Sequence, residues 1–171
     1  MRLKDKVAII TGAGQSEADG MGNGRATALS FARQGAKLML ANRSSPSMDE
    51  TARQVRAEGF AVESMLADIT NEDDCRQLMA ATTQAFGRID ILHNNVGAGT
   101  VEGDTADIDL AAWRQCLEMN LTGPMLLSKH VLPIMRAQQS GCITHTSSVA
   151  SVASLPLIAY KAAKSALNEF C

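Results

Sequence analysis

The chain has 171 residues, of which 46% are hydrophobic and 20% are charged, with a formal net charge of −2. These values are ordinary for a globular protein, and the weak negative charge argues against nucleic acid or an anionic membrane as a partner. No apolar run is long enough to cross a membrane, and the four cysteines lie far apart, without neighbouring histidines. We therefore expect free thiols, no metal site and a cytoplasmic location.

Strand and helix patterns alternate along the whole chain. Short apolar runs predict strands at 6–11, 37–41, 61–67, 89–93 and 142–146. Helical spacing predicts helices at 24–34, 47–58, 71–86 and 109–138, with a break in the last near Gly123 and Pro124, and a further helix beginning near Ala159. Such alternation is typical of an α/β fold in which helices cover both faces of a doubly wound, Rossmann-type parallel sheet. We expect residues 1–171 to form a single domain of this kind.

Local signals mark several helix ends. Ser47 and Glu50 have the spacing of a capping box for the second helix, and Asn71 is expected to cap the third. Gly35 and Gly87 are expected to end the helices that precede them, because glycine readily adopts the left-handed conformation of a helix C-terminus.

Glycines follow the first predicted strand, where ligands bind in folds of this class. Gly12 lies in the turn itself, and Gly22, Asn23 and Gly24 open the next helix. Backbone that can approach closely, combined with free N–H groups at a helix N-terminus, suits a pyrophosphate. Residues 15–21 are an insertion of about six residues relative to the usual turn of a dinucleotide site. The alternative is a flexible glycine-rich loop that binds nothing.

Polar residues follow the next strands. Asn42 does not repel a 2′-phosphate on the adenosine ribose as a carboxylate would, and Arg43 offers a guanidinium to bind it. Both could instead be ordinary surface residues. A carboxylate of the 15–21 insertion, Glu17 or Asp19, could also restore the repulsion if it lay over the ribose, which would favour NAD. After the third strand, Asp68 and Ile69 are candidates for the adenine edge, although Asp68 could equally cap the next helix. After the fourth strand, Asn94 to Gly97 form a polar turn beside the expected cofactor, or a turn with no further role.

Tyr160 and Lys164 are separated by four positions, which places them on one face of a helix. An ammonium beside a phenol favours the phenolate, so this tyrosine could exchange a proton with a carbonyl or alcohol oxygen near neutral pH. Alone, the pair is also compatible with an exposed tyrosine beside a solvated lysine.

Taken together, these motifs resemble the short-chain dehydrogenase/reductase family. The matching segments occur in the family's order and span essentially the whole chain: TGAG, GNGRATA, AD, NNVG, MNLTG, HTSS and YKAAK. The resemblance implies that Tyr160 is the catalytic acid/base and that Lys164 binds the nicotinamide ribose. Ser148 would hold the substrate oxygen, and Asn120 would hold a water that links Lys164 to solvent. Asn94 and Gly97 correspond to the family's NNAG element, with Val96 in place of the usual alanine.

Two departures from the family pattern affect these assignments. Ser147 has the usual separation from Tyr160, whereas Ser148 is one residue nearer; we prefer Ser148 because a loop absorbs a deletion more easily than a strand end. Family members also continue well beyond the position of Cys171 and add most of the substrate pocket there. We therefore expect either a fragment of a longer chain or a truncated product.

The sequence thus predicts an oxidoreductase that uses NADP, or less favourably NAD, to interconvert a ketone and a secondary alcohol. We expect a small-molecule substrate, no nucleic-acid or membrane partner, and a homodimer or homotetramer for a full-length form. One alternative is a catalytically silent dinucleotide-binding fragment. A second is a structural or regulatory protein that keeps the fold and binds no cofactor.

Overall fold

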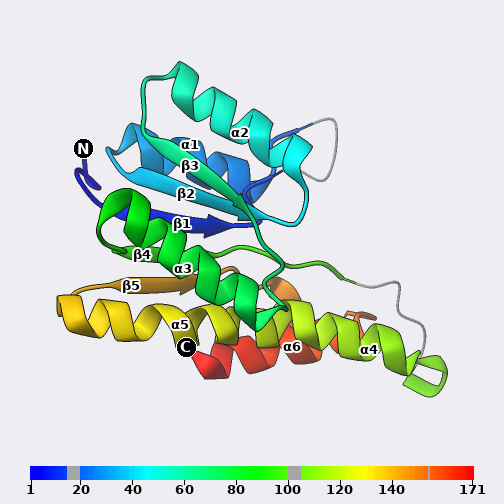
Figure 1. Cartoon of the computed structure of the whole chain (residues 1–171). Helices are drawn as coiled ribbons and strands as arrows, with labels where there is room; N and C mark the ends of the chain where they lie inside the picture. The colour runs from blue at the N-terminus through cyan, green and yellow to red at the C-terminus, as the bar shows by residue number, and fades with distance from the viewer. Residues whose placement is uncertain (15–19, 100–104, 154) are drawn as a thin grey trace.

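Five parallel strands form one sheet in the order β3–β2–β1–β4–β5 (Figure 1). The structure, a computed structural model, describes residues 1–14, 20–99, 105–153 and 155–171. The strands of the sheet are β1 (Val7–Thr11), β2 (Lys37–Asn42), β3 (Val62–Leu66), β4 (Ile91–Asn94) and β5 (Cys142–His145). This arrangement confirms the α/β, Rossmann-type sheet that the alternating pattern predicts.

Helices cover both faces of the sheet, as Figure 1 shows. One face carries α1 (Asn23–Arg33) and α2 (Ser45–Ala57), and the other carries α3 (Glu72–Phe86) and α5 (Gly123–Gln138). The remaining helices are α4 (Leu110–Leu117) and α6 (Ile158–Phe170), with short turns of other helix types, η1 (Thr105–Asp107), η2 (Glu118–Thr122) and η3 (Val149–Ser151). Within the described part of the chain, no helix combines the length and the apolar character needed to cross a membrane.

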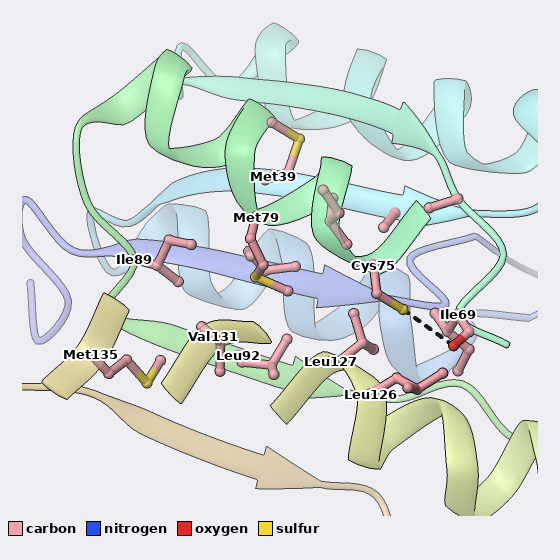
Figure 2. Packing of buried hydrophobic residues seen from close by; sticks show 14 residues of the cluster. Met39, Ile69, Cys75, Met79, Ile89, Leu92, Leu126, Leu127, Val131 and Met135 are labelled. Carbon is pink, nitrogen blue, oxygen red and sulfur yellow. Dashed lines mark hydrogen bonds between the residues drawn. The ribbon is translucent and has the colours of Figure 1, made fainter. Parts of the chain in front are cut away.

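The strands bury apolar side chains on both faces because successive residues point to opposite sides. In β1, Ala8 and Ile10 pack toward α1 and α2, whereas Ile9 packs toward α3 and α5. Figure 2 shows the second of these clusters, in which Met79 of α3 and Leu127 of α5 lie over the sheet. Full burial of one such aliphatic side chain contributes about 1.5–3 kcal/mol. The two clusters therefore fix the strand ends on which the site is built.

One cysteine takes part in this core as a small apolar residue. Cys75 of α3 is buried, and its Sγ donates to the carbonyl oxygen of Ile69 at 3.2 Å (Figure 2). Burial, reinforced by nearby carboxylates, raises the pKa of the Cys75 thiol to about 12. All four cysteines are free, as the sequence predicts.

Both predicted ends are right for α3, whereas for α2 the predicted start is wrong. Asn71 caps α3 by accepting hydrogen bonds from two backbone N–H groups, and Gly87 ends it in the left-handed conformation with φ of 79°. The capping box at Ser47 is wrong, because α2 already begins at Ser45. Pro46 stands in the first turn, where a missing N–H costs nothing, so the helix can start before Ser47.

The predicted break of the helix near Gly123 and Pro124 is also wrong, because the helix does not end there. The backbone stays helical from α4 to α5 and passes through a π-helical turn, η2, which comes before Pro124. A π turn accommodates one additional residue without ending the helix. Pro124 lies in the first turn of α5, where proline is tolerated.

Asp90 ties the start of β1 to the residues that lead into β4. Its buried carboxylate, 3% exposed, accepts hydrogen bonds from Lys6 Nζ at 3.2 Å, from the Val7 N–H at 3.0 Å and from the Arg88 guanidinium at 2.6 and 2.8 Å. Burial acts to raise the pKa of Asp90, but these donors outweigh it and hold the pKa below its ordinary value.

Replacing Asp90 by asparagine should lower the free energy of unfolding by about 1–3 kcal/mol, because a buried acceptor for three donors is weakened. A depressed pKa in the folded state gives stability that is present above the unfolded pKa of about 4 and is lost as the pH falls through the folded value. The difference between wild type and Asp90→Asn, measured by urea unfolding, should therefore be largest at neutral pH and shrink below pH ~4. Asp73→Asn, which breaks an exposed ion pair with Arg76, is the matched control and should change little. An equal effect of the two substitutions would contradict this account.

Candidate functional site

A cleft of about 780 Å³ opens at the carboxyl ends of the strands. It lies beyond the end of β1, which has β2 on one side and β4 on the other. The strand order reverses at this point, and such a point is the usual ligand site of these sheets. Most residues predicted from the sequence line this cleft: Gly12, Gly22, Asn23, Gly24, Asn42, Arg43, Asp68, Ile69, Gly97, Ser148, Tyr160 and Lys164. Ser147 lines it as well, whereas Asn94 and Asn120 are not among the lining residues.

The first turn brings two backbone segments unusually close together. A Cβ atom on Gly24 would lie 2.0 Å from the carbonyl oxygen of Gly12, so only glycine fits there. Gly12 itself has a φ of +63°, in the left-handed region. Gly22 occupies the N-cap of α1 without a side-chain cap, and the first turn of the helix carries no acidic residue. The free N–H groups and partial positive charge of this helix end suit an anion such as a pyrophosphate.

Asn95, which we did not single out from the sequence, joins this turn to β4 and β5. Its side-chain amide donates to the Gly12 carbonyl at 3.1 Å, its backbone N–H donates to Thr11 Oγ1 at 3.2 Å, and its Oδ1 accepts from Thr146 Oγ1 at 3.3 Å. Asn94 is instead buried, with its Nδ2 at 3.2 Å from His145 Nδ1 on β5. The NNVG motif indicates an asparagine at this position, but the motif alone does not distinguish which of its two asparagines faces the cleft. Asn95 lines the cleft and Asn94 does not.

Arg43 lies at the mouth of the cleft, beside the end of β3. Its side chain is 59% exposed, and a carboxylate oxygen of Asp68 lies 4.0 Å from its Nη1. Asp68 accepts from the N–H and the hydroxyl of Thr70 at 2.9 and 2.8 Å, while Asn71 caps α3, so the suggestion that Asp68 caps this helix is wrong. Burial acts to raise the pKa of Asp68, but the Thr70 donors and the Arg43 charge hold it below the ordinary value.

Lys164 is a buried ammonium at the other end of the cleft. Its side chain is only 2% exposed, and Nζ donates to the carbonyl oxygen of Thr146 at 2.9 Å. Nζ also lies 5.6 Å from the centre of the Tyr160 ring, so the charge sits one helical turn from the phenol, as the spacing predicts. Burial lowers the pKa of Lys164. Thr146 acts through its backbone carbonyl, for which the sequence offers no signal.

Asn120 lies within the π-helical turn η2 and is fully buried. Its amide nitrogen donates to the carbonyl oxygens of Ala98 and Cys116 at 3.0 and 2.9 Å. Its Oδ1 accepts no hydrogen bond from the residues that the structure describes. A Cβ on Gly97 would lie 2.9 Å from this oxygen and 3.0 Å from Lys164 Nζ, so both atoms face the same small space beside Gly97.

The two candidate serines have different partners. The hydroxyl of Ser147 donates to Asn168 Oδ1 at 2.6 Å, because an amide oxygen can only accept. Ser148 Oγ accepts from the Ala150 N–H at 3.1 Å and caps the short helix η3. Of these two serines, Ser148 donates its hydroxyl hydrogen to no residue that the structure describes, whereas Ser147 does. Of the 15–21 insertion, Glu17 and Asp19 lie outside the described residues.

Comparison with known proteins adds independent information about the chain. A family model described as short chain dehydrogenase matches residues 6–171. The chain is 34% identical over 161 residues to a cis-4-hydroxycyclohexanecarboxylate dehydrogenase from Sinomonas cyclohexanicum, covering 94% of this chain and 62% of the relative. It is 36% identical over 153 residues to a levodione reductase from Leifsonia aquatica, covering 88% and 55%. The chain therefore spans less than two thirds of the length of these relatives.

Solved structures show the same likeness in three dimensions. A levodione reductase superposes with a TM-score of 0.92 at 34% identity, covering 99% of this chain and 64% of the other. An NAD⁺-bound xylitol dehydrogenase gives 0.92 at 30% identity, covering 99% and 64%. A metagenomic short-chain oxidoreductase in complex with NADP gives 0.90 at 29% identity, covering 99% and 75%. The chain thus belongs to the short-chain dehydrogenase/reductase family, whose members are NAD(P)-dependent oxidoreductases.

Proposed function

We propose that the protein is an NADP-preferring oxidoreductase that interconverts a ketone and a secondary alcohol. One observation carries the proposal: Tyr160 and Lys164 project from one face of α6 into the same cleft that the glycine turn of Gly12 and Gly24 lines at its other end. The cleft thus combines a site suited to a pyrophosphate with a proton donor beside a fixed positive charge.

The side chains of the cleft have complementary roles in this reaction. A bound nicotinamide dinucleotide would supply or accept the hydride. Tyr160 gives a proton to the carbonyl oxygen during reduction and takes one from the alcohol during oxidation. Lys164, held by the Thr146 carbonyl, places a positive charge one helical turn from the phenol and would donate to the ribose hydroxyls of a bound cofactor. Ser148 donates its uncommitted hydroxyl hydrogen to the reacting oxygen.

Asn120 is suited to connect Lys164 with solvent through a water. Its buried Oδ1 needs a hydrogen-bond donor, and it faces the same space as Lys164 Nζ. A water in that space could accept from the ammonium and donate to the amide oxygen. This arrangement would return a proton to Tyr160 after each reduction, in which Tyr160 has given its own proton to the substrate oxygen.

The preference for NADP rests on the residues after β2. Arg43 is largely exposed at the cleft mouth, and its contact with Asp68 is long, so its guanidinium is available to a 2′-phosphate. Asn42 lines the same part of the cleft and carries no charge to repel that phosphate. Related structures contain NAD⁺ in one case and NADP in another, so membership of the family does not by itself decide the cofactor.

A catalytically silent dinucleotide-binding fragment is the second candidate. The chain spans 62% of the dehydrogenase relative from Sinomonas cyclohexanicum, so catalysis by these residues alone has to be tested directly. Incubation of the purified chain with NADPH and a panel of ketones separates the two. Oxidation of NADPH that depends on the ketone supports the oxidoreductase, whereas a cofactor-induced rise in Tm without turnover supports the fragment.

Replacing Tyr160 by phenylalanine should lower kcat by ~10²–10⁴, the usual contribution of general acid–base catalysis, and leave cofactor affinity nearly unchanged. Lys164→Ala should reduce both kcat and cofactor affinity, since the ammonium lies beside the Tyr160 ring and would donate to the ribose. Steady-state kinetics and cofactor titration measure these effects, and Lys161→Ala on the same helix is the control. A Tyr160→Phe variant that keeps most of its turnover would refute the proposed role.

The serines should differ when each is replaced by alanine. Ser148→Ala should lower kcat more than Ser147→Ala, because the hydroxyl hydrogen of Ser147 is already donated to Asn168. The comparison needs only the two kcat values under saturating cofactor. The opposite ranking would assign the contact with the substrate oxygen to Ser147.

Replacing Arg43 by alanine should remove most of the preference for NADPH over NADH. A charge-assisted hydrogen bond contributes about 1.5–3 kcal/mol, which corresponds to roughly 10–100-fold in the dissociation constant. The Kd of NADH should stay nearly constant, since it has no 2′-phosphate. Arg53→Ala, which removes an exposed arginine of α2, is the matched control. Tighter binding of NADH than NADPH by the wild type would instead point to a carboxylate near the ribose.

A further inference from the structure

A stripe of three polar residues runs along one face of α6. Tyr160, Lys164 and Asn168 follow one another at four-residue intervals and therefore lie one above the other. The first two line the cleft, whereas Asn168 lies one turn beyond it. The proposed reaction uses Tyr160 and Lys164 and leaves Asn168 without a role.

Asn168 binds the loop after β5 at two points. Its Oδ1 accepts from Ser147 Oγ at 2.6 Å, and its Nδ2 donates to Ser151 Oγ at 3.0 Å. These two serines flank Ser148 in the sequence. An amide is required for both bonds together, because one of its atoms accepts and the other donates.

Ser151, which accepts from Asn168, is itself hydrogen-bonded to Ser148. Its Oγ donates to the Ser148 carbonyl oxygen at 2.7 Å, and its N–H donates to the same oxygen at 3.0 Å. The carbonyl oxygen of Ser151 in turn accepts from Ser165 Oγ at 2.8 Å, a second contact with α6. The backbone around Ser148 is therefore held by the helix that carries Tyr160.

We infer that Asn168 is a positioning residue, which fixes the hydroxyl of Ser148 relative to that of Tyr160. The inference rests on the proposed function, in which both hydroxyls contact the same substrate oxygen. That contact requires a distance between the two groups that stays constant, and small misplacements of reacting groups reduce rates strongly. Two bonds from one amide provide this constraint, because the loop and the helix then move together.

The test compares Asn168→Ala and Asn168→Asp with Glu169→Ala, an exposed neighbour on the same helix. Asn168→Ala should lower kcat roughly tenfold, the value expected for losing hydrogen bonds of ordinary strength. The Kd of NADPH and the shape of the pH profile should not change, since Tyr160 and Lys164 are intact. Asn168→Asp keeps the acceptor for Ser147 but loses the donor to Ser151, so its kcat should lie between those of Asn168→Ala and the wild type.

Amide hydrogen exchange provides a readout that does not depend on turnover. The N–H groups of Ser151 and Val152 should exchange faster in Asn168→Ala than in the wild type and in Glu169→Ala. Unchanged exchange would overturn the inference, and so would faster exchange with kcat at the level of the control. A wild-type chain without turnover would count against the proposed catalysis alone. The exchange rates of the Ser151 and Val152 N–H groups in Asn168→Ala would still decide whether Asn168 holds the loop.

Discussion

The buried ammonium of Lys164 is the constraint on which the rest of the site depends. Removing a charge from water is costly unless polar partners surround it, so the neighbouring backbone must be placed accurately. The Thr146 carbonyl accepts from Nζ, Asn120 turns its amide oxygen to the same space, and Gly97 leaves room for both. The end of β5, the turn after β4, the π-helical turn and α6 thus converge on one side chain.

The other end of the cleft depends on close contact rather than on charge. Gly24 can approach the Gly12 carbonyl only because it lacks a side chain, and this contact brings the N-terminus of α1 next to the end of β1. Asn95 then links this turn to β4 and β5. The two apolar clusters on either face of the sheet hold these strand ends in register, so both halves of the cleft share one rigid support.

The sequence predicts features that depend on local chemistry and misses those that depend on neighbours in space. Asn71 and Gly87 end α3 as expected, because caps and left-handed glycines are local signals. The π-helical turn that carries Asn120 leaves no such signal, so the sequence predicts a break where the backbone stays helical. The position of Thr146 against Lys164 involves a backbone carbonyl, which every residue has.

Transfer of deuterium from the cofactor to the product tests the central claim most directly. The chain is mixed with a ketone and with NADPH that carries deuterium at the transferred position of the nicotinamide, and the alcohol is analysed by mass spectrometry. The account predicts an alcohol that carries one deuterium on its carbinol carbon, because the cleft brings cofactor and substrate together. Binding of NADPH without deuterated alcohol for any ketone would contradict it and leave a dinucleotide-binding chain without catalysis.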